Sequence, residues 1–122
     1  MANPFRIKGF STLRLSVVDV AKSCAWYARF LGIEASYVDP DFASFNVAGV
    51  QLDLCTADGR SPVSAGGSVG YWLVEDLDIA VARAKELGAA VYRGPLRVEE
   101  VRRSIVQVAD PYGNVFGLEA EF

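Results

Sequence analysis

The sequence predicts an α+β fold of two tandem βαβββ modules, whose curled mixed sheets surround a shared cleft. Three observations support this fold class. Two segments share the order strand, Asp, amphipathic helix and Leu-Gly; three strand-like runs follow each segment; and a polar stretch rich in Gly, Ser and Pro lies between the two copies. We therefore expect a single domain, with module one at about 11–56, a linker at about 57–66 and module two at about 67–120.

The two helix segments are SVVDVAKSCAWYARFLG and WLVEDLDIAVARAKELG. Asp19 and Asp76 stand where an N-cap accepts hydrogen bonds from free backbone amides. Gly32 and Gly88 follow 13 and 12 residues later, at the positions of left-handed C-caps. Apolar residues recur every three or four positions between these caps, so each helix is expected to bury one face.

The strand-like runs after the two helices also correspond. They cover 33–38, 42–47 and 50–55 in the first copy, and 90–93, 102–109 and 114–120 in the second. The turn at Ala48-Gly49 matches the turn at Gly113. In this alignment of the two copies, Asp53 of the first is equivalent to Gly117 of the second. Glycine inside a strand gives up side-chain packing, so Gly117 indicates a bulge or a close approach.

Composition and charge narrow the possible classes of function. A net charge of −3 offers no basic surface for nucleic acid. No apolar run approaches the ~20 residues of a membrane span, and MANPFRIKGF lacks the apolar stretch of a signal peptide, so we expect a cytoplasmic protein. Histidine is absent, which removes imidazole as a base, nucleophile or metal ligand. Cys24 and Cys55 fit reduced, buried thiols better than a disulfide.

Two motifs carry a specific resemblance. The first, D-x-x-x-S-x-x-W-Y, lies in the first helix, and the second, D-P-x-G-N-x-x-x-L, lies near the end of the chain. The matching residues are Asp19, Ser23, Trp26, Tyr27, Leu31 and Gly32, then Asp110, Pro111, Gly113, Asn114 and Leu118. In this order, on paired βαβββ modules, they resemble the vicinal oxygen chelate superfamily of glyoxalase I, extradiol dioxygenases and bleomycin-resistance proteins. The resemblance implies a U-shaped cleft between the modules.

The resemblance also implies where a metal would be bound. Catalytic members hold a divalent metal with residues from the first and last strand of each module. The corresponding positions here are Thr12, Asp53, Val69 and Gly117, and metal-binding relatives carry glutamate at the last of these. Only Asp53 is a good ligand, whereas zinc and iron sites need three or four donors. We therefore expect no metal and no other cofactor, and the chain resembles the metal-free bleomycin-resistance-like members most.

Alternation along the strands predicts the wall of the cleft. The residues expected to contact a ligand are Arg14, Ser16, Gln51, Asp53, Tyr71, Gly117 and Glu119. Tyr71 is the aromatic side chain favoured for ligand contact, while Trp26, Phe45 and Phe116 are expected in the core. Asp53 has a simpler alternative, in which it faces solvent or pairs with Arg14. The arginine-rich segment RGPLRVEEVRR is expected to pair with its own glutamates at the surface.

Three functions remain open on the sequence alone. The first is a metal-independent protein that sequesters a small organic molecule, such as an antibiotic, in a cleft that a homodimer completes. The alternative is a lyase, isomerase or dioxygenase-like enzyme, in which Asp53 or Glu119 acts as general base and Arg14 stabilises negative charge. The third is a subunit or regulatory domain whose cleft no longer binds anything.

Overall fold

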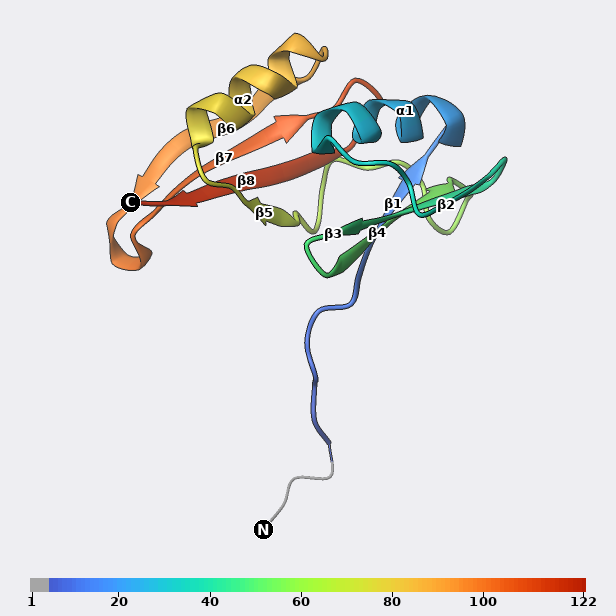
Figure 1. Ribbon diagram of the computed structural model, residues 1–122, viewed down its shortest axis with the longest axis horizontal. Coiled ribbons are helices and arrows are strands. Elements are labelled where there is room, and N and C mark those ends of the chain that lie inside the picture. The colour runs from blue at the N-terminus through green and yellow to red at the C-terminus, as the bar shows by residue number, and fades with distance from the viewer. Residues whose placement is uncertain (1–4) are drawn as a thin grey trace.

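The computed structural model describes residues 5–122 and contains two four-stranded mixed sheets, each with one α-helix (Figure 1). The first sheet has strand order β1-β4-β3-β2 and the second β5-β8-β7-β6, and neither closes into a barrel. The tandem α+β fold is therefore confirmed. The elements are β1 (Thr12–Val17), α1 (Val20–Leu31), β2 (Tyr37–Asp39), β3 (Phe42–Val47), β4 (Val50–Thr56), β5 (Tyr71–Leu73), α2 (Leu77–Glu86), β6 (Ala90–Val98), the 3-10 turn η1 (Glu99–Val101), β7 (Arg103–Ala109) and β8 (Val115–Glu121).

Both predicted N-caps are confirmed. The Asp19 carboxylate accepts the amide of Lys22 at 3.0 Å, and the Asp76 carboxylate accepts the amide of Ile79 at 3.0 Å. Helix α1 ends at Gly32, whose φ of 71° is left-handed as a C-cap requires. Helix α2 ends at Glu86 and its C-cap is Leu87, with a φ of −91°, so the C-cap predicted at Gly88 lies one residue too late; Gly88 itself is left-handed, with a φ of 91°.

Two of the predicted strand runs differ from the structure by more than one residue at an end. The run 33–38 begins as a strand only at Tyr37, because β2 is a short edge strand that pairs with β3 alone. The run 90–93 continues to Val98 as β6, past Gly94-Pro95. Proline lacks an amide donor and is therefore rare in the middle of a sheet. The strand continues because β6 lies at the sheet edge, and its pairing with β7 shifts register on both sides of Arg93.

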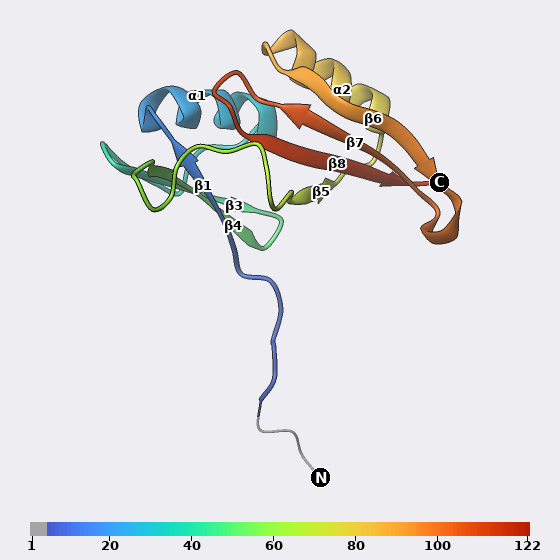
Figure 2. The ribbon, with the colours of Figure 1, turned by 180° about the vertical axis from the view of Figure 1, so that it is seen from behind.

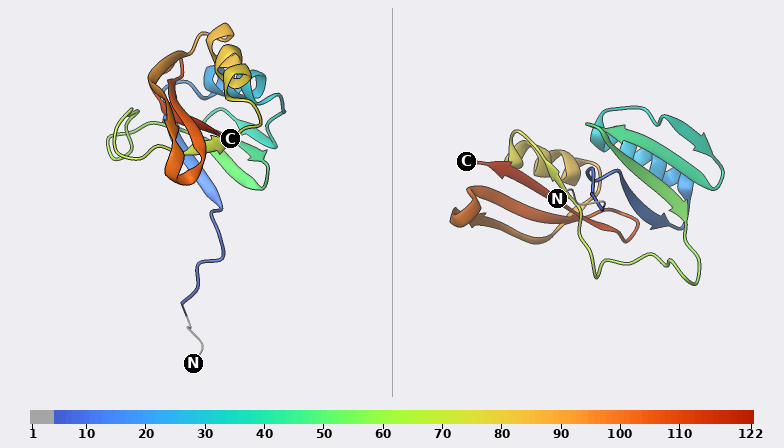
Figure 3. Two further views of the ribbon diagram at one scale, coloured as in Figure 1. Left: turned by 90° about the vertical axis from the view of Figure 1, so that its left-hand side faces the viewer. Right: turned by 90° about the horizontal axis from the view of Figure 1, so that it is seen from below.

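Helix α1 packs against both modules. The rings of Trp26, Tyr27 and Phe30 surround Phe116 of β8, with centroid distances of 6.2, 6.1 and 5.2 Å. All four side chains are buried, as is Phe45 of β3, so the predicted core positions are confirmed. Figure 3 (right) shows α1 behind the first sheet, with the second sheet beside it. One aromatic cluster therefore joins the two modules.

Hydrogen bonds along the same contact between α1 and the second module, which we call the seam, also join the two modules. The Tyr27 hydroxyl donates to the buried carboxylate of Asp110, which also accepts the amides of Tyr112 and Asn114 at 2.8 and 3.1 Å. Burial first, and then the negative charge of Asp110, raises the pKa of Tyr27 well above its ordinary value. The DPYGN turn thus folds around one carboxylate that also holds the helix of the other module.

Two further contacts extend this seam. The Trp26 indole Nε1 donates to the Leu87 carbonyl at 2.6 Å. Arg83 of α2 donates from Nε to the Phe30 carbonyl at 2.7 Å and from Nη2 to the Arg29 carbonyl at 2.7 Å. These carbonyls end α1, where a cation is favoured by the helix dipole. Arg83 therefore caps the helix of the opposite module.

The remaining features of the fold lie at its surface. Residues 5–9 extend away from both sheets (Figures 1 and 2). Cys24 and Cys55 are free and half-buried, and burial raises the pKa of the Cys24 thiol. Within residues 5–122, neither helix has the length and apolar character needed to cross a membrane.

Candidate functional site

The predicted wall residues of module one share one face of the first sheet. In β4, Leu52 and Leu54 are 1% and 0% exposed, while the alternate residues Gln51 and Asp53 point to the opposite side. The parallel pairing of β1 with β4 places Arg14 beside Asp53. We call this side, away from α1, the open face of the first sheet; it carries Thr12, Arg14, Ser16, Ser44, Gln51 and Asp53.

Asp53 is held by neutral neighbours on this open face. Its Oδ1 accepts a hydrogen bond from Ser44 Oγ at 2.9 Å and another from Gln51 Nε2 at 2.9 Å. The predicted alternative of an Arg14–Asp53 ion pair is not formed. Within residues 5–122, the ion pairs are Arg97–Glu99 and Arg103–Glu119. The Arg14 guanidinium is therefore left without a carboxylate partner among these residues.

On the second sheet, one tyrosine explains the glycine in β8. The pairing of the strands sets Tyr71 of β5 and Gln107 of β7 on either side of Gly117. A Cβ added to Gly117 would lie no more than 2.5 Å from Cγ, Cδ2 and Cε2 of the Tyr71 ring. Carbon atoms in contact are normally about 3.5–4.0 Å apart, so only glycine leaves room for this ring. The predicted close approach at Gly117 is confirmed, and the group that approaches is Tyr71.

Gln107 holds the hydroxyl of that tyrosine. Its Nε2 donates to the Tyr71 hydroxyl at 2.9 Å, and both side chains are half-buried. Gln107 was not among the predicted site residues. The signal for it is a polar residue between Val106 and Val108, which are both 1% exposed, so alternation alone places it on the open side. We call the side with Tyr71, Gln107, Gly117 and Glu119 the open face of the second sheet.

Glu119 has a partner on the open face of the second sheet. Its carboxylate forms an ion pair with Arg103 at 3.0 Å, and the two side chains are 27% and 31% exposed. Arg97 pairs with Glu99 at 3.1 Å, so the arginine-rich segment pairs with its own glutamates at that point, as predicted. Arg103 instead reaches across to β8.

The residues at the four metal positions do not fit a metal. Their side chains offer one carboxylate at Asp53, one hydroxyl at Thr12, and no donor at Val69 or Gly117. The Tyr71 ring covers Gly117, so the space of a carboxylate ligand is filled. Within residues 5–122, no three His, Cys, Asp or Glu side chains come together in a way that could hold a metal ion. A zinc or iron site requires a larger donor set.

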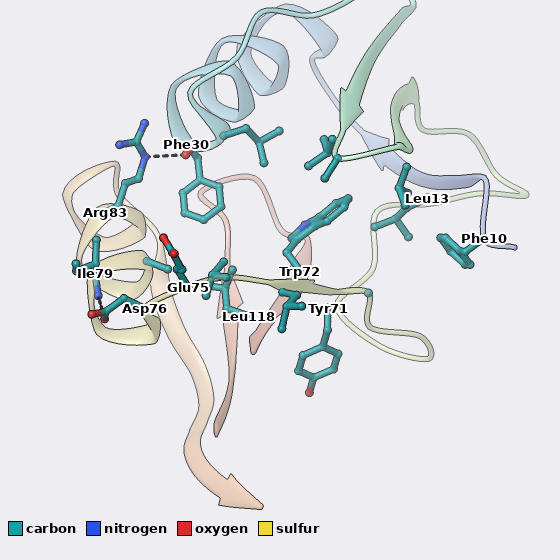
Figure 4. Close-up of a pocket in the computed structure, with 18 residues that line it drawn as sticks. Phe10, Leu13, Phe30, Tyr71, Trp72, Glu75, Asp76, Ile79, Arg83 and Leu118 are labelled. Carbon is teal, nitrogen blue, oxygen red and sulfur yellow. Dashed lines mark hydrogen bonds between the residues drawn. The ribbon is translucent and has the colours of Figure 1, made fainter. Parts of the chain in front are cut away.

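A large pocket lies on the other side of β5, between the two modules (Figure 4). It has a volume of about 860 Å³ and is lined by Phe10, Leu13, Phe30, Leu31, Val47, Ala48, Val50, Gly70, Tyr71, Trp72, Leu73, Val74, Glu75, Asp76, Ile79, Ala80, Arg83 and Leu118. We call it the inter-module pocket. Of the predicted ligand-contact residues only Tyr71 lines it, and Figure 4 shows the Tyr71 ring pointing away while the Trp72 ring points in.

The inter-module pocket is mostly apolar, and two of its polar residues already have structural roles. Asp76 caps α2 and Arg83 caps α1. Sequence reasoning missed this pocket because its walls come from the core-facing sides of strands in both modules. Tyr71 and Trp72 are consecutive residues of one strand, so their side chains lie on opposite faces of the second sheet.

Two βαβββ modules, each with its helix on one side and an open sheet face on the other, define a paired-module α+β fold. This chain belongs to the Glyoxalase/Bleomycin resistance protein/Dioxygenase superfamily, whose family model matches residues 9–118. The resemblance found in the two sequence motifs is therefore confirmed.

Solved structures share the fold at low sequence identity. A structure described as a conserved domain protein is 25% identical, with a TM-score of 0.76, over 93% of this chain and 99% of that one. A protein of Agrobacterium tumefaciens solved by solution NMR is 24% identical, with a TM-score of 0.80, over 95% and 99%. The fosfomycin resistance protein FosX of Listeria monocytogenes, in complex with Mn(II) and sulfate, is 21% identical, with a TM-score of 0.78, over 96% and 93%.

Proposed function

We propose that this protein binds a small organic molecule, without a metal, on the open faces of its two sheets. The observation that carries the proposal is the Tyr71 ring lying over Gly117, where metal-binding relatives have a glutamate. A side chain that fills the place of a metal ligand converts that position from coordination to contact with an organic group.

The chemistry of the two open faces supports binding of this kind. They combine an aromatic ring at Tyr71 with a few polar groups at Arg14, Gln51 and Asp53, and small-molecule sites commonly have such a mixture. We further propose that a second copy of the chain completes the cleft. Under this proposal, sedimentation equilibrium at micromolar concentration gives a dimer, and a monomer would contradict the shared cleft.

A thermal-shift series on chelator-treated protein tests the absence of a metal role. Zinc, nickel, manganese and iron are compared with cationic, glycosylated and aromatic antibiotics and small 2-oxo compounds. A ligand that binds only the folded state at 100 times its Kd stabilises it by about 2.7 kcal/mol. We expect such a shift with at least one organic compound and none with the metals. A reproducible shift with a metal alone would contradict the proposal.

Neighbouring residues of β5 then locate the site. Tyr71→Ala removes a ring from the open face, and Trp72→Ala removes a ring from the inter-module pocket. Each variant is compared with its own melting temperature without ligand, so a loss of stability does not enter the comparison. We expect the ligand-induced shift to fall in Tyr71→Ala and to persist in Trp72→Ala. The reverse pattern would place the ligand in the inter-module pocket.

A further inference from the structure

We propose that the Tyr71 hydroxyl, which lies beside the position where metal-binding relatives carry a ligand, donates a hydrogen bond to an oxygen of the bound organic molecule. The ligand would then be a flat organic molecule bearing a carboxylate, phenolate or carbonyl oxygen. This inference rests on the proposed function and names the class of ligand for the same open faces.

The first step of the argument is position. Gly117 and Asp53 correspond to the positions on the last strand of each module where the metal-binding relatives have ligands. Tyr71 lies beside Gly117 in the second sheet, just as Arg14 lies beside Asp53 in the first. Tyr71 and Arg14 therefore occupy equivalent places, next to these positions. Both side chains are hydrogen-bond donors.

The second step is the unused proton of the phenol. A tyrosine hydroxyl offers one proton and accepts through its oxygen. Gln107 Nε2 donates to that oxygen at 2.9 Å, so the oxygen is held while the proton is left to donate. Within residues 5–122 that proton has no acceptor among the hydrogen bonds of the structure. A half-buried donor fixed by a neighbour loses little freedom when it binds an acceptor.

The third step compares the charged groups on the open faces. The Glu119 carboxylate is paired with Arg103, and Oδ1 of Asp53 already accepts two hydrogen bonds. The Arg14 guanidinium has no carboxylate partner among residues 5–122. The available groups at the two equivalent places are thus a cation and a hydroxyl donor, which suit an oxygen acceptor on the ligand.

A purely structural role for Tyr71 makes a different prediction. If the ring only fills the space above Gly117, phenylalanine would serve equally well, because it has the same ring without the hydroxyl. Tyr71→Phe therefore removes the proposed donor and keeps the packing. Tyr92→Phe is the matched control, since Tyr92 is an exposed tyrosine of β6 and is not among the residues that define the two open faces.

The test uses three probes with one aromatic body and different polar groups: 2-naphthoate, 2-naphthamide and 2-naphthylmethylammonium. Their affinities for the native full-length chain and each variant are measured by isothermal titration calorimetry. We expect the carboxylate to bind more tightly than the ammonium. Its affinity should fall about tenfold in Tyr71→Phe, the usual effect of losing a hydrogen bond to a charged group, and stay unchanged in Tyr92→Phe. Gln107→Leu should weaken the same probe, because the phenol loses its anchor.

The outcomes separate this inference from the proposed function. Unchanged binding of 2-naphthoate to Tyr71→Phe, or tighter binding of the ammonium than of the carboxylate, overturns the inference and leaves small-molecule binding intact. Probes that lose affinity only in Trp72→Ala overturn it in favour of the inter-module pocket. If none of the three probes binds the native chain, the inference and the proposed open-face site both fail.

Discussion

Replacing Gly117 with alanine should destabilise the protein, although alanine normally suits a strand better than glycine. The new Cβ would lie within 2.5 Å of three Tyr71 ring carbons, and one of them is Cγ, close to the backbone. A small rotation of the ring therefore does not relieve the overlap, and moving the whole ring breaks the 2.9 Å hydrogen bond from Gln107. Overpacking of this kind costs about 1–3 kcal/mol, against a gain of about 0.5–1 kcal/mol from removing glycine.

The middle of these two ranges gives a net cost of about 1 kcal/mol, which corresponds to a fall in Tm of about 3–5 °C for a domain of this size. A double-mutant cycle with Tyr71→Ala, followed by urea denaturation, isolates the cause. Once the ring is removed, Gly117→Ala should be neutral or stabilising. Gly59→Ala is the control, because a Cβ there meets nothing within 4 Å. The same loss of stability from Gly117→Ala in both backgrounds would refute the explanation.

Three further substitutions test the seam between the modules. Tyr27→Phe should lower the free energy of unfolding by about 2 kcal/mol at pH 7, by removing the hydrogen bond to Asp110. Because the pKa of Tyr27 is raised in the folded state, its contribution to the free energy of unfolding is complete below the ordinary value of 10.0 and is lost as pH rises above it. In urea titrations at alkaline pH, the free energy of unfolding should therefore fall less steeply with pH in Tyr27→Phe than in the native chain. Arg83→Lys should cost about 1 kcal/mol by calorimetry, because an ammonium does not reproduce the two-nitrogen cap on α1; full stability in the lysine variant would contradict that role. Trp26→Phe should cost about 2–3 kcal/mol in the same assay, since it opens a cavity and removes the bond to Leu87, and an unchanged Tm would show that the indole contributes neither.

The fold could be predicted from the sequence because its signals are local. Asp19 and Gly32 mark the ends of α1, and the same pattern recurs around Asp76 in the second copy. Alternation along β4 separated Leu52 and Leu54 from Asp53, because the two faces of a strand have different environments. The duplication then allowed each feature of one module to support the assignment of the other.

The site was less predictable because it depends on register between strands and on how the modules meet. Alternation puts Tyr71 and Gly117 on one face, but only the pairing of β5 with β8 makes them neighbours. Gln107 joins them through the pairing of β7 with β8, which its own strand does not reveal. The inter-module pocket requires the relative placement of two modules, for which the sequence contains no local signal.

The packing of α1 against Phe116 has a consequence for cutting the chain. A break in the polar loop at 57–66 would leave one fragment with an exposed aromatic helix and the other with an exposed strand from which that helix is missing. Each fragment would hold the surface that the other needs, so we expect the two to reassemble on mixing, and neither to be stable alone. Under this prediction, the repeated halves are complementary parts of one folding unit and not two autonomous copies.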